Sequence, residues 1–200
     1  MQPSPTPAIT LITGGSRGLG KSAALHLAQH GGDVILTYRS KRDEAQAVVA
    51  DIEALGRRAV ALPLNVADSS SFATFATEVR KVLAQHWQRE HFDALVNNAG
   101  VGIYASLMDT TEAQFDELMN IHFKGVFFLT QKLLPLIADG GRIVNISTGL
   151  TRFALPNYSA YASMKGAIEV LTRYMAKELG PRGIAVNTLE IGRASCRERG

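Results

Sequence analysis

The sequence predicts one α/β domain, a doubly wound parallel sheet with helices on both faces. Apolar runs of strand length alternate with longer amphipathic stretches along the whole chain. Several of the short runs are apolar without alternation, which is typical of strands buried on both faces. A length of 200 residues suits a single domain with a full core, and no repeat or internal linker interrupts the pattern.

Each element follows from its residues. The predicted strands are the apolar runs AITLIT (8–13), DVILTY (33–38), RAVALPL (58–64), DALVN (93–97), RIVNIS (142–147) and IAVNTL (184–189). Amphipathic stretches fill the five gaps as predicted helices, at residues 19–30, 41–55, 69–88, 111–138 and 157–179. Asp68 and Thr111 are expected to cap helices, and Gly31, Gly56 and Gly180 to end them. Because a helix joins each strand to the next, we expect parallel strands with ligand sites at their carboxyl ends.

The C-terminal residues break this pattern. After the sixth predicted strand the chain turns polar without a helical or strand period, and IGRASCRER resembles the translation of a sequencing-library adapter. We therefore interpret residues 190–200 as a non-native tail, and residues 1–189 as the domain, incomplete at its C-terminus. A natural basic tail is the alternative interpretation.

Charge and hydropathy argue against two classes of partner. The net charge is +3, but without the last ten residues the chain has 18 basic and 17 acidic residues and no basic stripe, which argues against nucleic acid. No stretch approaches the ~20 apolar residues of a membrane span. The N-terminal MQPSPTP has neither a basic flank nor an apolar run, and the single cysteine, Cys196, fits a reducing compartment. We expect a cytoplasmic protein.

A glycine-rich turn follows the first predicted strand. In TGGSRGLG, the residues Gly14, Gly18 and Gly20 have the spacing GxxxGxG and lead into the first helix. Glycines there allow a tight turn and the close approach of a pyrophosphate, which meets the free N–H groups at the start of the helix. A purely steric turn is the alternative, but the position on the first strand of a doubly wound sheet favours a phosphate site.

An arginine follows the second predicted strand, where a site for NAD usually has a carboxylate that holds the ribose hydroxyls. The chain has Arg39 there, followed by Ser40, and it has Arg17 in the glycine-rich turn. Two converging guanidinium groups suit a 2′-phosphate. The sequence therefore predicts NADP(H) in preference to NAD(H), with a solvent-exposed Arg39 as the alternative.

The fourth predicted strand ends in NNAG, residues 97–100. Its alanine and glycine would allow a cofactor to approach closely, whereas its asparagine amides can tie adjacent strands together. For Asn97, structural bracing and direct cofactor contact stay equally open.

Tyr161 and Lys165 are the candidate reacting pair. Of the five tyrosines, Tyr161 alone has a lysine four residues later, and this spacing places both side chains on one face of the last predicted helix. A neighbouring ammonium favours the phenolate, so Lys165 is expected to lower the pKa of Tyr161, which then exchanges a proton during hydride transfer. YxxxK alone is a weak pattern, but after a dinucleotide loop and NNAG it becomes a strong one.

In this order and spacing, TGxxxGxG, NNAG, a Ser-Thr pair after RIVNI, and YxxxK resemble the short-chain dehydrogenase/reductase family over residues 9–189. The resemblance implies a Rossmann fold, a homodimer or homotetramer, and interconversion of a small-molecule carbonyl and a secondary alcohol without a metal. It implies that Tyr161 is the general acid/base, and that Lys165 lowers its pKa and holds the nicotinamide ribose. The cofactor contacts that it implies are Gly14, Ser16, Arg17, Gly18, Leu19 and Gly20 for phosphates and ribose, Asn65 and Val66 for the adenine, and Asn98, Ala99 and Gly100 for the far ribose.

Two catalytic positions depart from the family pattern. The serine that hydrogen-bonds the substrate oxygen usually lies thirteen residues before the tyrosine, which is Thr148 here; a threonine hydroxyl donates the same bond, and Ser147 stays a close alternative. In MNIHFKGVFF, His122 stands where the family often has an asparagine that helps to build a water path to the lysine. Histidine titrates near neutrality and both donates and accepts, so relay and packing roles stay equally open.

The third departure concerns the C-terminal end. Where the family continues into a Pro-Gly turn, a substrate loop and a last strand, the chain reads TLEIGRASC, so we expect the last strand and the substrate loop to be missing. We expect the 200-residue chain to be poorly soluble or inactive, and an extended form with a native C-terminal segment to be active. The expected activity is that of an NADP(H)-dependent oxidoreductase. A 3-oxoacyl thioester reductase and a non-catalytic nucleotide sensor of the same fold are the alternatives.

Overall fold

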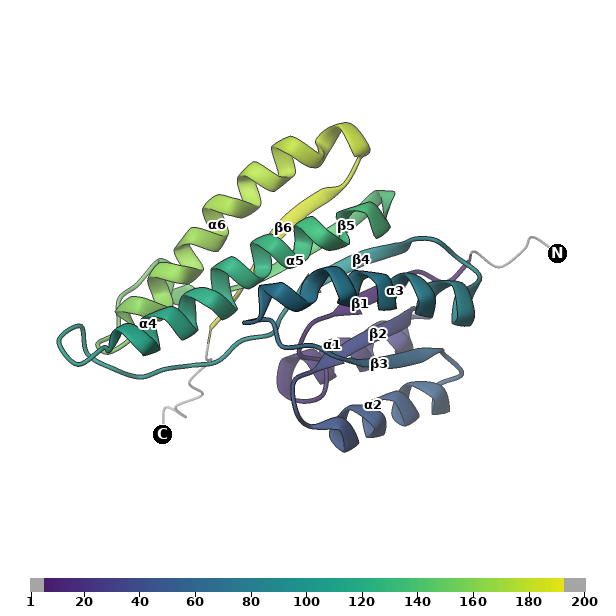
Figure 1. Cartoon of the computed structure of the whole chain (residues 1–200), viewed down its shortest axis with the longest axis horizontal. Helices are drawn as coiled ribbons and strands as arrows, with labels where there is room; N and C mark the ends of the chain where they lie inside the picture. The colour runs from purple at the N-terminus through teal and green to yellow at the C-terminus, as the bar shows by residue number, and fades with distance from the viewer. Residues whose placement is uncertain (1–5, 193–200) are drawn as a thin grey trace, which may run out of the picture.

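One parallel sheet of six strands forms the centre of the molecule and confirms the doubly wound α/β fold (Figure 1). The computed structural model describes residues 6–192. The strand order is β3-β2-β1-β4-β5-β6, so the chain winds outward from β1 in one direction and, after β3, in the other. The strands are β1 (Ile9–Ile12), β2 (Asp33–Tyr38), β3 (Ala59–Pro63), β4 (Phe92–Asn97), β5 (Ile137–Thr148) and β6 (Ala185–Ile191).

Helices connect the strands as predicted. The α-helices are α1 (Gly18–Gln29), α2 (Arg42–Ala54), α3 (Phe72–Trp87), α4 (Glu112–Met119), α5 (Gly125–Leu133) and α6 (Ser159–Leu179). Shorter turns are η1 (Ser69–Ser71), the π-helical η2 (Asn120–Lys124), η3 (Leu134–Leu136), η4 (Gly149–Thr151) and η5 (Gly180–Arg182).

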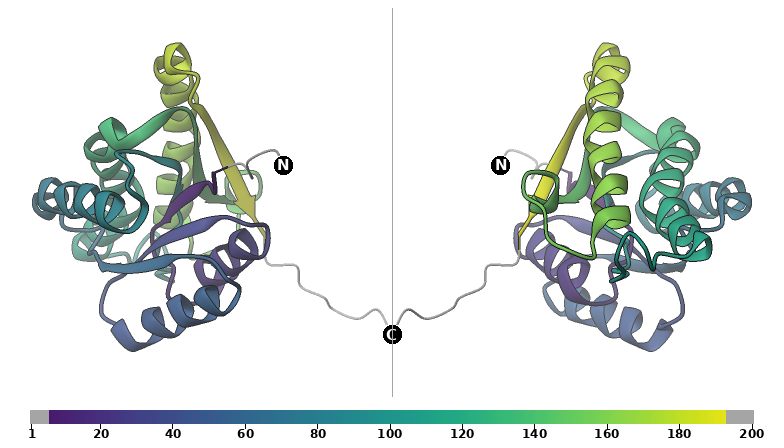
Figure 2. Two further views of the ribbon diagram at one scale, coloured as in Figure 1. Left: turned by 90° about the vertical axis from the view of Figure 1, so that its right-hand side faces the viewer. Right: turned by 90° about the vertical axis from the view of Figure 1, so that its left-hand side faces the viewer.

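Two helical layers pack on the sheet: α1 and α2 on one face, and α3, α5 and α6 on the other (Figure 2). Adjacent residues of a strand point to opposite faces, so Leu11 packs in the core beneath α3 and α5, whereas Ile12 packs in the core beneath α1 and α2. Ile35 and Leu36 of β2 divide in the same way. Both faces of these strands are buried, which explains their unalternating apolar sequences.

The prediction of one long helix over residues 111–138 is wrong. The helix widens into the π-helical turn η2 after α4, resumes as α5, and ends in η3, after which β5 begins at Ile137. Pro135 lies in η3 and has no N–H to continue an α-helical hydrogen-bond ladder, so the apolar stretch around it cannot extend the helix. β5 is correspondingly longer at its start than the predicted strand, because Ile137 already pairs with Phe92 of β4.

The predicted caps and stops hold in most places. The Asp68 carboxylate accepts from the N–H of Ser70, and Thr111 forms a reciprocal capping box with Gln114. Gly31 and Gly56 are left-handed, with φ of 87° and 73°. Gly180 follows the last residue of α6 as predicted, but its backbone is right-handed. The chain first forms the turn η5, and the left-handed residue is Gly183, directly after that turn.

The last described strand runs past its predicted end. Glu190 and Ile191, which we assigned to the tail, pair with Ser147 and Thr148 of β5. Residues 193–200 of the predicted tail lie outside the described residues. Within residues 6–192, no helix is long and apolar enough to cross a membrane.

Candidate active site

The glycine-rich turn after β1 is shaped by close backbone contacts. Gly14 is left-handed, with φ of 67°, and a Cβ there would lie 3.0 Å from Ala99 Cα. A Cβ on Gly20 would lie 2.2 Å from Gly14 O and 2.6 Å from Asn98 Nδ2. Arg17 caps α1 in an extended conformation without a side-chain hydrogen bond, so the first N–H groups of the helix stay available to an anion. The turn therefore has the form of a phosphate cradle.

Asn98 and Thr13 fix this turn to the end of β4. The Thr13 hydroxyl accepts from the N–H groups of Asn98 and Ala99, at 2.9 and 3.0 Å. The Asn98 amide donates to Thr13 O at 2.9 Å and to Gly14 O at 3.1 Å. Thr13 was not predicted from the sequence as a site residue. Its position as a polar residue at the end of an apolar strand, directly before a glycine, could have indicated it. The clamp explains why TGG and NNAG lie together.

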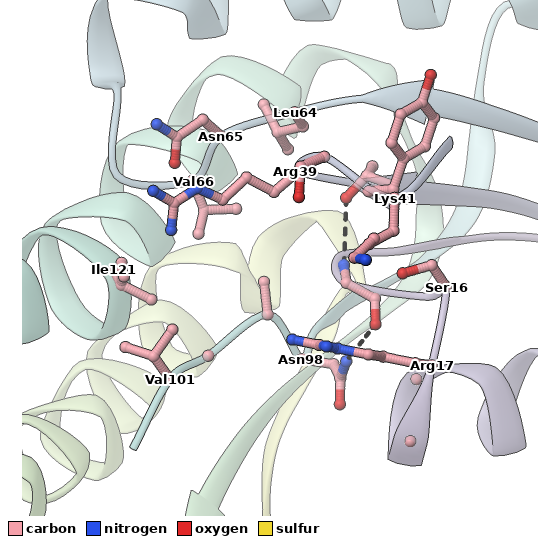
Figure 3. A pocket seen from close by; sticks show the side chains of 18 of the residues that line it. Ser16, Arg17, Arg39, Lys41, Leu64, Asn65, Val66, Asn98, Val101 and Ile121 are labelled. Atoms are coloured by element: carbon pink, nitrogen blue, oxygen red, sulfur yellow. Dashed lines mark hydrogen bonds between the residues drawn. The ribbon is translucent and has the colours of Figure 1, made fainter. Parts of the chain in front are cut away.

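A pocket of about 610 Å³ opens between the glycine-rich turn and the ends of β2, β3 and β4 (Figure 3). All thirteen residues predicted outside α6 for cofactor binding line it: Gly14, Ser16, Arg17, Gly18, Leu19, Gly20, Arg39, Ser40, Asn65, Val66, Asn98, Ala99 and Gly100. Sequence reasoning missed Thr37, Tyr38, Lys41, Leu64, Val101 and Ile121, which complete the lining. Thr37 also accepts from Gly14 N–H at 3.2 Å, which ties the turn to β2.

The first pocket carries positive charge. Arg17, Arg39 and Lys41 line it, and no aspartate or glutamate of the described residues does. The guanidinium groups of Arg17 and Arg39 border the same space without meeting, so the structure shows a shared pocket and no direct convergence (Figure 3). Lys41 lies two residues beyond Arg39 in YRSK, a signal that could have been used. The pocket thus suits a ligand with several negative charges.

Asn97 braces the sheet. The residue is 5% exposed, and its amide donates to Asn145 Oδ1 of β5 at 2.8 Å and to Thr130 Oγ1 of α5 at 3.1 Å. Asn145 donates in turn to Thr172 Oγ1 of α6, at 2.9 Å. The side chain lines neither pocket at this edge of the sheet, which supports the bracing role.

A second pocket, of about 780 Å³, adjoins the first. The two share Leu19, Asn98, Gly100 and Val101, so they form one continuous cleft at the carboxyl ends of the strands. The structure brings all five predicted catalytic residues together in the second pocket: His122, Ser147, Thr148, Tyr161 and Lys165. No group of three or more His, Cys, Asp or Glu residues within the described chain could hold a metal ion.

Tyr161 and Lys165 share one face of α6, but their pKa values differ from the prediction. The ammonium of Lys165 lies 5.8 Å from the centre of the Tyr161 ring and donates to Ile146 O at 2.7 Å. Burial raises the pKa of Tyr161, and Tyr158 raises it further. The predicted lowering by Lys165 is therefore not found in this structure, because the phenol is half-buried and the ammonium bonds a carbonyl instead. Burial also lowers the pKa of Lys165 to about 8.

Ser147 and Thr148 point in different directions. Ser147 Oγ donates to the Glu169 carboxylate of α6 at 2.8 Å, which holds its proton away from the pocket. Thr148 Oγ1 accepts from Leu150 N–H at 3.4 Å, so its own proton is free to be donated into the pocket. These contacts favour Thr148 as the hydroxyl that meets a substrate.

His122 lies in the π-helical turn and is 2% exposed. Its Nε2 lies 2.7 Å from Val101 O, its ring meets Tyr161 edge-on at 5.2 Å, and its Nδ1 is buried without a hydrogen-bond partner in the described chain. Burial, followed by the charge of Lys165, lowers the pKa of His122 to about 4. The prediction that this histidine titrates near neutrality is therefore wrong; it is neutral at pH 7.

Known proteins resemble the chain over most of its length. A 3-oxoacyl-[acyl-carrier-protein] reductase from Staphylococcus aureus is 36% identical over 91% of this chain and 72% of the relative. The structure of a short chain dehydrogenase from Burkholderia cenocepacia in complex with NADP is 39% identical, with a TM-score of 0.84 over 92% of this chain and 73% of that one. An angucycline C-6 ketoreductase, LanV, with bound NADP is 34% identical, with a TM-score of 0.88 over 92% and 71% of the two chains.

The family model for short chain dehydrogenases matches residues 8–196. This range contains the glycine-rich turn, NNAG and the Tyr161–Lys165 pair, which the fold brings to one cleft. The chain therefore belongs to the short-chain dehydrogenase/reductase family of oxidoreductases.

Proposed function

We propose that the chain is an NADP(H)-dependent oxidoreductase that reduces a ketone to a secondary alcohol and catalyses the reverse reaction. The observation that carries this proposal is the continuous cleft, in which a positively charged phosphate cradle leads directly to Tyr161, Lys165 and Thr148. The similar Burkholderia dehydrogenase and LanV, both with NADP, support it. A cytoplasmic location is part of the proposal and rests on the single cysteine.

The first pocket fits a dinucleotide phosphate. Gly14 and Gly20 allow the turn to pack tightly against Ala99 and Asn98, and Arg17 caps α1 without a side-chain hydrogen bond, so the first N–H groups of α1 can bind a pyrophosphate. Arg39 and Lys41 follow β2, where a 2′-phosphate would lie, and no carboxylate of residues 6–192 lines the pocket to repel it. NADP(H) is thus preferred over NAD(H). When bound, this cofactor supplies or accepts the hydride.

The second pocket supplies the proton. At neutral pH the raised pKa keeps the Tyr161 phenol protonated, so it can donate its proton to the carbonyl oxygen as the carbonyl carbon gains a hydride. The C=O double bond becomes C–H and O–H. The ammonium of Lys165 can stabilise the phenolate that forms only by turning from Ile146 O toward the phenol oxygen. The Thr148 hydroxyl orients the carbonyl by donating a hydrogen bond to it. Oxidation of an alcohol reverses these transfers.

His122 is proposed as a positioning and relay residue that acts without changing its charge. Its neutral ring can donate from Nε2 to Val101 O, which leaves Nδ1, without a partner among residues 6–192, free to accept a hydrogen bond from a proton-bearing group in the pocket. Its edge-on contact with the Tyr161 ring also holds the phenol in place.

A 3-oxoacyl thioester reductase is the second candidate. The Staphylococcus aureus relative, 36% identical over 91% of this chain, is the observation that favours it. A non-catalytic nucleotide sensor is less well supported, because the cleft retains the tyrosine, the lysine and a hydroxyl donor together.

A homodimer or homotetramer is proposed through α5 and α6. These helices border an apolar groove of about 670 Å³ lined by Phe127, Val170 and Tyr174 among others. These three residues are 38%, 44% and 63% exposed. A contiguous apolar patch of this kind is typical of a protein–protein interface.

The test is the absorbance change of NADPH with a panel of ketones, measured on the 200-residue chain and on the extended form. We expect the extended form to oxidise NADPH with at least one ketone and to use NADH less well. Tight binding of NADPH without turnover of any ketone or 3-oxoacyl thioester would instead support the nucleotide sensor. Robust turnover by the 200-residue chain would contradict our expectation that it is inactive.

A further inference from the structure

Two loops meet at the mouth of the catalytic pocket: residues 101–110, which follow β4, and residues 149–158, which connect β5 to α6. The first loop lines the pocket with Val101 and Gly102, whereas Tyr104 lies outside the lining and reaches the pocket only through its contact with Tyr158. The N–H of Ala105 donates to Asn157 O at 3.1 Å, and the rings of Tyr104 and Tyr158 meet edge-to-face, 5.4 Å between centres. Asn157 is left-handed, with φ of 71°, and the next residue, Tyr158, is the N-cap of α6. A backbone hydrogen bond and an aromatic contact thus join the two loops.

A row of aromatic rings leads from the surface to the catalytic tyrosine. Tyr104 is 68% exposed, Tyr158 is half-buried, and the centres of the Tyr158 and Tyr161 rings lie 6.4 Å apart. His122 continues the row inward, edge-on to Tyr161. A flat substrate ring that packs against Tyr158 would therefore also lie close to Tyr161, the proposed proton donor.

The pocket wall beside Tyr158 is apolar and almost free of charge. Leu150, Phe153 and Leu155 line the pocket beside Tyr158, and Phe153 and Leu155 are 54% and 51% exposed. Lys165 is the one charged side chain that lines the pocket within the described residues. Arg152, the nearest cation of this loop in sequence, is paired with Glu190 at 2.7 Å and does not line the pocket. Among residues 6–192, Lys165 is thus the only cation in this pocket that could pair with a phosphate or carboxylate on the substrate, and it lies at the reaction centre beside Tyr161.

We propose that the substrate is an uncharged ketone on a fused or aromatic ring, and that Tyr104 and Tyr158, the aromatic clamp, determine this specificity. The inference rests on the proposed function and specifies its substrate class. Aromatic side chains bind flat rings in stacked or edge-on geometry and gain more from them than from a flexible chain. A carrier-bound thioester brings a charged phosphate and polar amides, which this wall does not match.

The experiment compares kcat/KM for 2-tetralone, cyclohexanone and the acetoacetyl thioester of N-acetylcysteamine, using the extended form and NADPH. We expect 2-tetralone to be the best substrate. Tyr158→Leu should lower kcat/KM about 10-fold for 2-tetralone and less than about 2-fold for cyclohexanone, because the smaller ring loses little contact. Tyr104→Leu should act in the same direction, and Tyr158→Phe should restore 2-tetralone turnover. Phe128→Leu, at an exposed aromatic position of α5, is the control.

The ratio of the two ketones isolates the clamp. Tyr158 also raises the pKa of Tyr161, and that effect changes both ketones equally, so it cancels in the ratio. Equal losses for both ketones, or a preference for the thioester, would overturn the proposal. If no probe is reduced although NADPH binds, the proposed function fails, and calorimetric binding of 2-naphthol then decides about the clamp. Loss of naphthol affinity in Tyr158→Leu would support the aromatic clamp, and unchanged affinity would refute it.

Discussion

Burial sets the protonation states of the three titratable side chains around the candidate carbonyl site. It raises the pKa of Tyr161, lowers that of Lys165 to about 8 and lowers that of His122 to about 4. At neutral pH Tyr161 therefore holds a proton, Lys165 carries mostly its charge and His122 is neutral. This set favours carbonyl reduction, since the acid begins in its protonated form.

His122 makes folding sensitive to acid. Its pKa is about 4 in the folded protein against 6.5 for the free side chain, so the unfolded chain binds more protons between these values. The free energy of unfolding therefore falls as the pH drops through this window. Between pH 7 and pH 4.5, His122 is expected to lower the free energy of unfolding by about 2 kcal/mol. The His122→Asn variant should not show this loss. Urea unfolding of both proteins at the two pH values measures it.

An exposed histidine is the control for this prediction. His26 lies on the outer face of α1, and His26→Asn should keep the pH dependence of the unmodified protein. If His122→Asn loses as much stability between pH 7 and pH 4.5 as the unmodified protein, His122 is not held in its neutral form.

Thr148 and Ser147 can be separated by turnover. Thr148→Ala should lower kcat about 10²-fold, because a hydrogen bond to the developing alkoxide is lost. Ser147→Ala should keep turnover within a few-fold and lower stability by about 1 kcal/mol, since it removes the bond to Glu169. Steady-state kinetics and urea unfolding of the two variants provide the measurement. A larger loss of kcat in Ser147→Ala would reverse the assignment.

At the residue scale, motif order predicted the positions in the cleft but could not predict their chemistry. Tyr161 and Lys165 were found from spacing alone, since i and i+4 share a helix face whatever surrounds them. The direction of the Tyr161 pKa depends on burial and on Lys165 bonding Ile146 O, which no local pattern encodes. Lys41, by contrast, could have been predicted from its place two residues after Arg39, although the structure was needed to show that the loop after β2 brings it into the pocket.

At the scale of elements, the π-helical turn between α4 and α5 fixes the position of His122. Gly125, which follows this turn, has no room for a side chain: a Cβ would lie 2.2 Å from Val66 O and 2.7 Å from Asn120 O. The start of α5 therefore packs directly on the backbone beyond β3. His122 and the cofactor pocket are held in register by this contact.

Gly125→Ala should consequently destabilise the protein by about 1–3 kcal/mol, because the added methyl meets backbone atoms that cannot move aside cheaply. Gly166→Ala is the matched control. Gly166 also lies in a helix, but a Cβ there would have no atom within 4 Å. Alanine at this position should raise the free energy of unfolding by up to about 1 kcal/mol, because of its higher helix propensity. Thermal or urea unfolding distinguishes them, and equal stabilities would show that α5 does not pack tightly on Val66.

Most elements could be predicted from local sequence, because their apolar periods and caps are local. The bounds of β2 agree fully, and Thr111 caps α4 as expected. The break inside residues 111–138 could not be predicted by periodicity, and neither could the close packing of Gly125 on Val66, which lies more than fifty residues earlier in the chain. Pro135, by contrast, was a local breaker that the periodic pattern masked.

At the scale of the whole molecule, the exposed apolar groove between α5 and α6 is proposed to be covered by a second copy of the chain. Val170→Glu places a charge in this groove and should yield a monomer, measured by light scattering after size-exclusion chromatography. Leu55→Glu, at a 45% exposed position after α2, is the control and should keep the oligomer. A monomeric unmodified protein, or an unchanged oligomer in Val170→Glu, would contradict this interface.

The order of the strands determines that the candidate site lies at the carboxyl ends of the sheet. β1 and β4 are neighbours although β2 and β3 lie between them in sequence, so the crevice between the two halves opens at their carboxyl ends. The phosphate cradle follows β1, NNAG follows β4, and Thr148 ends the adjacent β5. The alternation of strands and helices predicted this edge, but the continuity of the two pockets needed the structure.

The most direct test of the account is the turnover number of Tyr161→Phe beside its affinity for NADPH, both in the extended form. The phenylalanine keeps the ring that packs on His122 and removes the donated proton. We expect kcat for ketone reduction to fall about 10²–10⁴-fold while the Kd for NADPH changes less than about 2-fold. Ketone reduction by Tyr161→Phe at the rate of the unmodified protein would contradict the assignment of Tyr161 as the proton donor.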